Sequence, residues 1–209
     1  ERARRDALSA NLRRQPLSLP DAPDSSPTFA FTYTLLLPLL VILPAFISGS
    51  IAADTITEEI DAGTLPLLLV TPVSAAEVVD GKMLATIALA PLQAAAWLAL
   101  VGINGTSIAD PLPIVALAGA LATILVALGV GLALRFETRQ STQLLYSLAV
   151  FAVFGLAALL PESPPNTVAK LALGSATDLT YGLVGGYLAV AVAGYLLARW
   201  GARRAIDAE

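Results

Sequence analysis

The chain has 209 residues, of which 56% are hydrophobic and only 13% charged, with a net charge of −4 and a mean hydropathy of +0.76. Soluble domains carry about 25% charged residues, so the scarce charge and the long uncharged stretches indicate an integral membrane protein. The absence of cysteine and histidine excludes disulfide frameworks, thiolate or imidazole metal sites and histidine-dependent triads, and the acidic balance argues against nucleic acid as a partner.

The first predicted element is an arm, residues 1–28, which we expect on the external side of the membrane. Residues 1–15 are charged, and residues 16–27 form a linker rich in proline, serine and aspartate. Because the chain begins with Glu1 and shows no signal peptide, we interpret it as part of a longer protein. The composition, with few lysines and an acidic balance, would suit a salt-loving (haloarchaeal) organism.

Five apolar segments follow, and most approach the ~20 residues with which an α-helix crosses ~30 Å of hydrocarbon. Barrel-type alternation is absent, and lipid cannot satisfy free backbone groups, so the sequence predicts an all-α, polytopic transmembrane helix bundle. Pro38 and Pro44 in the first segment and Pro91 in the second predict kinks. The five predicted spans are 29–51, 83–103, 112–134, 144–160 and 179–200.

The loop between the first two spans, residues 54–82, mixes carboxylates with a short leucine-rich run. Thr64 is a plausible N-cap for a short apolar helix over 65–70, which Thr71 and Pro72 end. Six apolar residues are too few to cross a bilayer, so they must be buried in the bundle, the lipid interface or a partner. A surface-lying elbow without a partner is the alternative. The carboxylates of the loop are Asp54, Glu58, Glu59, Asp61, Glu77 and Asp80.

Two further loops and one span carry local signals. The loop 104–111 contains the sequon Asn104-Gly105-Thr106, whose use for glycosylation the sequence leaves open. In the loop 161–180, residues 166–173 form an amphipathic piece closed by Gly174, expected at the outer interface or as an ordinary surface turn. In the third span, small residues at four-residue spacing allow close helix approach. They are Gly119, Thr123, Ala127 and Gly131.

Orientation follows from lysine and arginine, which favour the cytoplasmic side. One end of the spans receives six such residues, and the other receives only Lys170 in its short loops. The six-residue end, with the 54–82 loop and the tail 201–209, should therefore be cytoplasmic, in a multi-pass protein of the cell membrane. The arginines of the arm would lie outside, which a long translocated region explains; otherwise one span is misassigned. The six are Lys82, Arg135, Arg139, Arg199, Arg203 and Arg204.

No Asp, Glu, Lys or Arg lies in the interior of the spans, with Arg199 at the end of the last one, which argues against secondary carriers, proton pumps and membrane-embedded enzymes. We therefore predict no catalytic, cofactor-binding or metal-binding residues. Gln93 is a polar exception that either bonds a neighbouring helix or touches a substrate. With Pro38 and Pro44 it forms a possible substrate path.

The run EEIDAGTLPLLLVTPVSAAEVVDGK resembles the cytoplasmic segment of ABC-2-type exporter permeases, including sodium-exporter-like and multidrug branches. Asp61 replaces a glutamate of that pattern, and Ile60 and Pro66 depart from it, which puts the salt bridges of those positions in question. The matching residues are Glu59, Gly63, Thr64, Leu65, Leu68, Thr71, Pro72, Val73, Ser74, Gly81 and Lys82.

The resemblance implies a coupling helix that docks on a cytoplasmic ABC ATPase subunit, which binds ATP and Mg. It also implies six spans in the whole protein and a second permease subunit, identical or not. The chain lacks a G-x-x-x-x-G-K-[ST] loop of its own. The alternative is a non-transporting anchor or assembly factor, and the substrate stays open. The ATPase-coupling residues would be Glu59, Asp61, Gly63, Thr64, Leu65, Leu68, Thr71, Pro72, Gly81 and Lys82.

Overall fold

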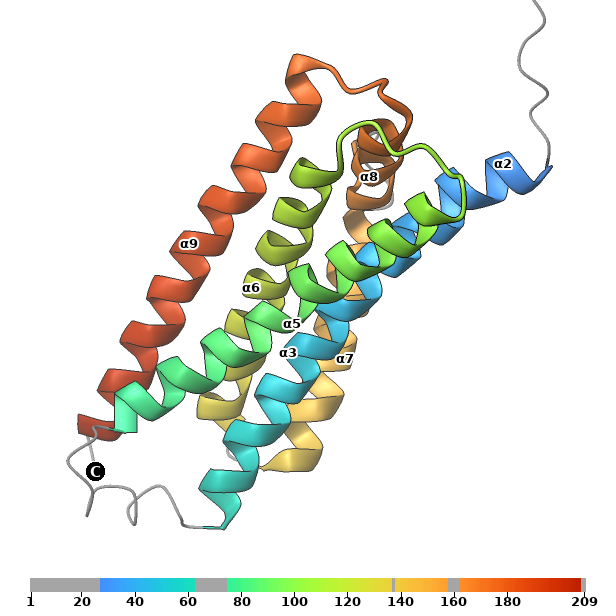
Figure 1. Ribbon diagram of the computed structural model, residues 1–209. Coiled ribbons are helices and arrows are strands. Elements are labelled where there is room, and N and C mark those ends of the chain that lie inside the picture. Colours follow the sequence, from blue (N-terminus) through green and yellow to red (C-terminus); the bar gives the residue numbers. More distant parts are fainter. Residues whose placement is uncertain (1–26, 63–74, 137, 158–161, 208–209) are drawn as a thin grey trace, which may run out of the picture.

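The computed structural model describes residues 27–62, 75–136, 138–157 and 162–207, and every regular element in these ranges is a helix. Five of them are long and apolar enough to cross a membrane, within residues 27–61, 77–103, 111–136, 139–157 and 178–204. The predicted polytopic all-α bundle with five spans is therefore confirmed. In Figure 1 the long helices extend from one end of the bundle toward the other.

The first span is a continuous helical path made of three parts. Helix α2 (Pro27–Phe31) leads into a π-helical turn, η1 (Thr32–Leu36), and then into α3 (Leu37–Asp61). The wider turn has a local cause in Pro38, which offers no N–H and whose ring crowds the carbonyl one turn earlier. The Leu37 N–H accordingly bonds the Thr32 carbonyl, five residues back.

The remaining helices are α5 (Ala75–Ile103), α6 (Pro111–Phe136), α7 (Arg139–Ala157), α8 (Pro164–Leu173) and α9 (Asp178–Asp207). Helix α3 continues beyond the expected end at residue 51, and α5 begins well before residue 83. Helix α9 also continues through residues that we expected in the tail. These differences share one cause, since a helix keeps its own hydrogen bonds after it leaves the hydrocarbon.

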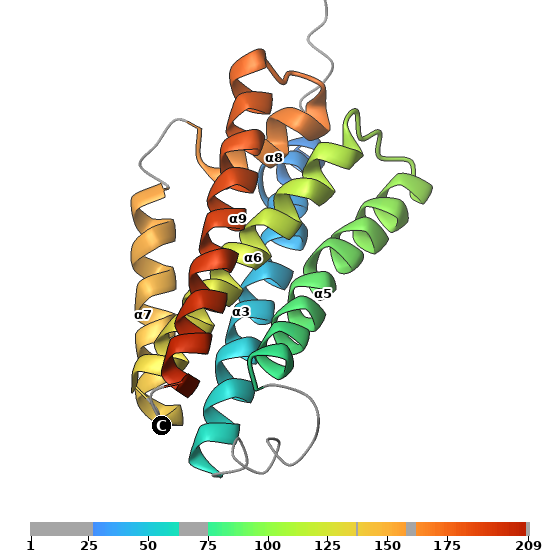
Figure 2. The same cartoon turned by 90° about the vertical axis from the view of Figure 1, so that its left-hand side faces the viewer.

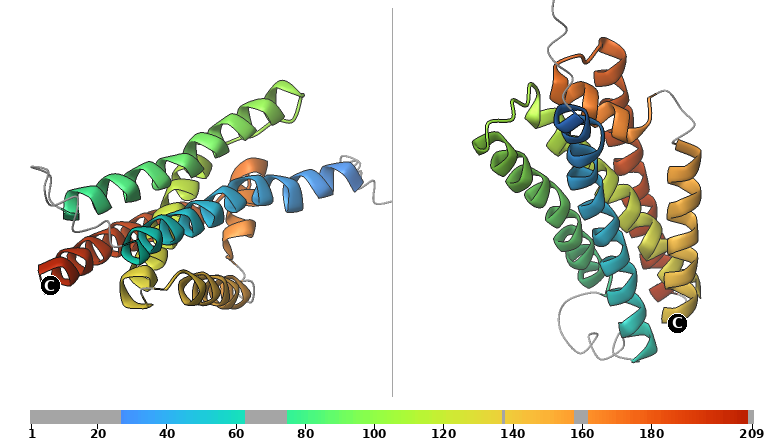
Figure 3. Two further views of the ribbon diagram at one scale, coloured as in Figure 1. Left: turned by 90° about the horizontal axis from the view of Figure 1, so that it is seen from below. Right: turned by 90° about the vertical axis from the view of Figure 1, so that its right-hand side faces the viewer.

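Helix α6 is the centre of the bundle and contacts α3, α5, α7, α8 and α9. Seen from two directions in Figure 3, α5 and α7 lie on opposite sides of α3. Figure 2 shows α9 running alongside α6. The outer faces of α5, α7 and α9 expose leucine, valine and aromatic side chains, as helices in contact with lipid do.

A close helix crossing joins α3 and α6 at two glycines. A Cβ added to Gly129 would lie 2.6 Å from the Gly49 carbonyl oxygen, and one added to Gly49 would lie 2.8 Å from the Leu125 carbonyl oxygen. The predicted small-residue ladder lies elsewhere on α6: Ala127 faces Gly194 of α9 at an ordinary 3.6 Å. Gly119 also lies near a neighbouring helix, with its added Cβ 3.8 Å from Pro91, whereas a Cβ added to Gly131 meets nothing within 4 Å.

At the end of the bundle opposite the last turn of α3, α8 packs against η1, α3 and α6. Its residues Val168 and Leu171 are fully buried, and the Ala109 N–H donates to the Ala172 carbonyl at 3.0 Å. Gly174 ends the helix with a φ of +68°, the left-handed conformation that glycine adopts at little cost. The amphipathic piece is thus a helix docked on the bundle, rather than a surface turn.

Candidate functional site

Three ion pairs gather at the end of the bundle where α3 stops and α5 starts, which we call the loop end. Each pair joins two different helices: α3 to α5, α3 to α7, and α5 to α9. We refer to these three pairs together as the ion-pair belt. The belt consists of Glu59–Lys82, Asp54–Arg139 and Asp80–Arg199.

The first pair stands at the two roots of the segment 63–74. Glu59 lies in the last turn of α3 and Lys82 in the second turn of α5, and both side chains are only partly exposed. A partly shielded pair of this kind contributes on the order of 0.2–1 kcal/mol, so its main effect is geometric. It fixes the distance between the helix that enters the segment and the helix that leaves it.

The second pair ties α3 to α7 through two hydrogen bonds. Arg139 donates from Nε to Asp54 Oδ1 at 2.5 Å and from Nη2 to Asp54 Oδ2 at 2.7 Å. Such a two-bond arrangement fixes orientation as well as distance, because the guanidinium and the carboxylate are both planar. Arg139 is the first residue of α7, so the contact sets where that helix begins against α3.

The same seam continues into the membrane through polar side chains at helical spacing. Gln143 donates to the Ser50 carbonyl at 3.2 Å and accepts from the Ser50 hydroxyl at 3.2 Å. One turn deeper, the Tyr146 hydroxyl donates to the Phe46 carbonyl at 2.9 Å. Hydrogen bonds between helices are favourable in lipid, where water offers no alternative partner. Helix α7 is thus held on α3 by specific polar contacts.

The third pair reaches α9. Arg199 Nε lies 2.8 Å from Asp80 Oδ2, and the Tyr195 hydroxyl donates to Asp80 Oδ1 at 3.4 Å. Arg199 and Tyr195 are one turn apart, so one face of α9 receives the carboxylate of α5. Four of the five spans are therefore connected at the loop end by side chains of opposite charge.

The ion-pair belt gives three carboxylates of 54–82 a role that the sequence did not indicate. Asp54, Glu59 and Asp80 are engaged by basic residues of the same chain. Glu58 and Asp61 are the exposed carboxylates at the end of α3. The basic partners of Asp54, Glu59 and Asp80 belong to the set of lysines and arginines that predicted the orientation. The sequence did not indicate which residues pair, because the two members of each pair lie 23 to 119 residues apart.

The predicted coupling residues divide into two groups. Glu59 and Asp61 end α3, and Gly81 and Lys82 lie near the start of α5. The short helix expected over 65–70 lies outside the described residues. So do its six predicted coupling residues, which are Gly63, Thr64, Leu65, Leu68, Thr71 and Pro72.

The predicted substrate path is only partly gathered in one place. Pro44 and Gln93 line a groove of about 340 Å³ between α3 and α5, together with Ser48 and apolar side chains. Pro38 is buried in the core instead. Gln93 is exposed, and among the described residues no interhelical hydrogen bond is formed by its amide. The interhelical alternative for Gln93 therefore has no partner within the described part of this chain.

A five-span helical bundle with an ion-paired loop end defines the class of protein: a multi-pass membrane protein. A family model described as ABC-2 family transporter protein matches residues 3–176, and the chain belongs to this family. Its members are generally non-catalytic membrane subunits of ABC transporters that work with an ATP-binding subunit. The chain is accordingly an ABC transporter membrane permease. Searches of curated proteins and of solved structures gave no match.

Proposed function

We propose that the chain is the permease subunit of an ABC exporter, driven by a separate cytoplasmic ATPase that contacts residues 54–82. The observation that carries this proposal is the ion-pair belt. Residues 63–74 connect α3 and α5 directly, and the belt extends that connection to α7 and α9. A force applied to one short segment would therefore reach four spans together.

The energetic requirement is that the ATPase bind the segment unequally in its two states, since only a difference in affinity shifts an equilibrium. In this proposal the loop end and the C-terminus are cytoplasmic, and ATP and Mg are bound by the partner. A second permease subunit completes the transporter. The groove of Pro44 and Gln93 forms part of the path, where an amide in a mostly apolar wall costs free energy unless substrate, water or the second subunit meets it.

The docking part of the proposal is tested by co-purification. The full-length protein would be expressed with the ATP-binding subunit encoded beside it, and the recovered ATPase measured. Leu68→Asp places a charge on the proposed docking helix and should lower recovery about tenfold or more, which corresponds to ~1.4 kcal/mol. Leu112→Asp, an exposed leucine at the opposite end of the bundle, is the matched control and should leave recovery unchanged.

The same preparations separate transport from anchoring. A coupled permease changes the rate of ATP hydrolysis of the subunit that it binds, and a passive anchor does not. Equal recovery of ATPase with Leu68→Asp and Leu112→Asp would contradict docking through residues 54–82. Loss of recovery with Leu68→Asp, but with an ATPase rate that is indifferent to the chain, would support the anchor instead.

A further inference from the structure

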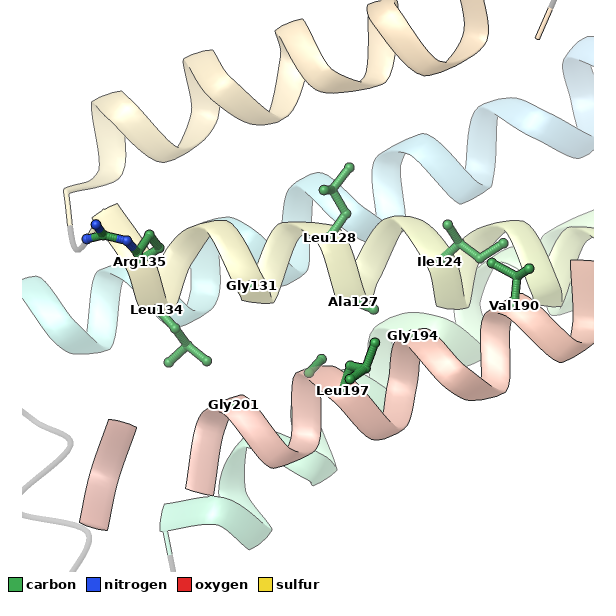
Figure 4. A pocket seen from close by; sticks show the side chains of 11 residues that line it. Ile124, Ala127, Leu128, Gly131, Leu134, Arg135, Val190, Gly194, Leu197 and Gly201 are labelled. Atoms are coloured by element: carbon green, nitrogen blue, oxygen red, sulfur yellow. The ribbon is translucent and has the colours of Figure 1, made fainter. Parts of the chain in front are cut away.

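A second groove lies between α6 and α9, away from the proposed substrate path. Its volume is about 490 Å³, and it opens on the outer surface of the bundle. Figure 4 shows the two helices diverging toward the loop end, with Arg135 at that end of α6. Small residues keep the groove open, since a Cβ added to Gly131 or Gly201 would meet nothing within 4 Å.

The groove has the length and chemistry of one lipid chain. On α9 it runs from Val190 to Gly201, which at 1.5 Å per residue is ~16 Å. That is about half of the ~30 Å hydrocarbon thickness, the depth of one leaflet. Apart from Arg135, the side chains that line it carry no charge, as with Ile124, Leu128 and Leu197.

The loop end of the groove is basic. The Arg135 side chain is exposed, stacks over the Phe136 ring at 5.9 Å, and forms no ion pair with the described residues. Arg204 follows Gly201 by three residues, so helical spacing places it about one turn beyond the last residue of α9 that lines the groove. Its guanidinium lies 3.8 Å from the centre of the Trp200 ring. Tryptophan and arginine side chains at such a position are typical of the headgroup level.

We propose that this groove binds an anionic phospholipid, with one acyl chain between α6 and α9 and the phosphate at Arg135 and Arg204. Basic pockets between membrane helices select anionic headgroups, and each basic residue near the surface contributes about 1 kcal/mol. The apolar wall and the basic end are complementary to the two halves of such a lipid. This site does not depend on the proposed transport function.

Spin-labelled lipids test the site. The full-length protein would be placed in vesicles of equimolar phosphatidylglycerol and phosphatidylcholine, each spin-labelled in turn, and the motionally restricted fraction measured. The wild-type protein should favour phosphatidylglycerol, and Arg135→Gln should lower that preference about fivefold. Arg203→Gln is the matched control, because residue 203 faces away from the groove on the same helix and is exposed.

Filling the groove separates a built site from diffuse charge. Gly201→Leu should displace the restricted phosphatidylglycerol. Gly185→Leu adds the same side chain to open space on the opposite face of α9 and should not. Equal effects of the two arginine variants, or no effect of Gly201→Leu, would overturn the proposal. So would a change of oligomeric state with Gly201→Leu in light scattering, because it would indicate that a protein surface fills the groove.

Discussion

Gly49 and Gly129 allow α3 and α6 to approach at backbone distance. Lipid tails are as apolar as leucine, so burial of apolar side chains gives helices in a bilayer little reason to associate. Association depends instead on dispersion contacts and interhelical hydrogen bonds, both of which need close and well-oriented surfaces. The two glycines allow close dispersion contacts at this crossing. Nearby, the Tyr146 hydroxyl donates an interhelical hydrogen bond to the Phe46 carbonyl.

The crossing gives a prediction for Gly129→Ala. The new Cβ would lie 2.6 Å from a backbone oxygen that cannot move without shifting α3, so the free energy of unfolding should fall by about 1–3 kcal/mol. The measurement is the unfolding midpoint in mixed micelles of increasing SDS fraction. Gly131→Ala is two residues away, where the new Cβ meets open space, and it should be neutral or slightly stabilising. Equal midpoints for both variants would contradict a tight crossing.

The sequence could not indicate which small residues make this contact. Gly119, Thr123, Ala127 and Gly131 share one face of α6 by spacing, whereas Gly129 belongs to another. In a span that is apolar on every side, the core face and the lipid face have the same composition. The partner glycine on α3 lies 80 residues earlier in the chain, so only the folded structure reveals the pair.

The sequence predicted the spans as helices correctly, but it predicted the residues at which the helices end less accurately. Hydropathy detects the part of a helix that crosses hydrocarbon, which is why all five spans were found. Helix α3 nevertheless continues to Asp61 and α9 to Asp207, because charged residues favour water without breaking a helix. The structure has a π-helical turn before Pro38, and the kinks expected at Pro38, Pro44 and Pro91 stay predictions.

At the opposite end of the bundle, α8 depends on its glycine cap. Gly174→Val would place a β-branched side chain at a φ of +68°, with its Cβ about 3.1 Å from that of Ala109. The left-handed conformation costs such a residue on the order of 1–2 kcal/mol. The amides of Ala109 and Asp110, which bond carbonyls of α8, should therefore exchange hydrogen about tenfold faster.

Hydrogen exchange followed by mass spectrometry checks this prediction on peptides that cover residues 104–112. The control is Gly182→Val, in a regular helix at the same end, where the new Cβ meets nothing within 4 Å. Unchanged exchange in Gly174→Val, or equal acceleration in both variants, would contradict the role of the cap.

On the scale of the whole molecule, α6 lies at the centre of the bundle and the ion-pair belt lies at its loop end. The belt joins residues that stand apart in the sequence, as an acidic loop and as a set of basic residues. Charge counting used the basic residues for orientation and the acidic ones for a partner, so the two sets were not matched to each other. Of the three residues of the predicted substrate path, Pro44 and Gln93 line one groove, because they lie on facing sides of α3 and α5. That this groove carries substrate stays a prediction.

The central claim is that the ion-pair belt transmits the conformational state of an ATPase to the spans. A charge exchange tests this claim most directly. The rate of ATP hydrolysis would be measured in vesicles for the full-length protein with its ATP-binding subunit, as wild type, Glu59→Lys, Lys82→Glu and the double exchange. Each single variant places two like charges at the roots of residues 63–74, which breaks the pair that joins α3 to α5.

We predict that each single variant retains the bound ATPase but loses most of the chain's effect on its rate. The double exchange should restore that effect, because it re-forms the pair with reversed polarity. Rates that follow the wild type in both single variants, with the ATPase still bound, would contradict coupling through the ion-pair belt.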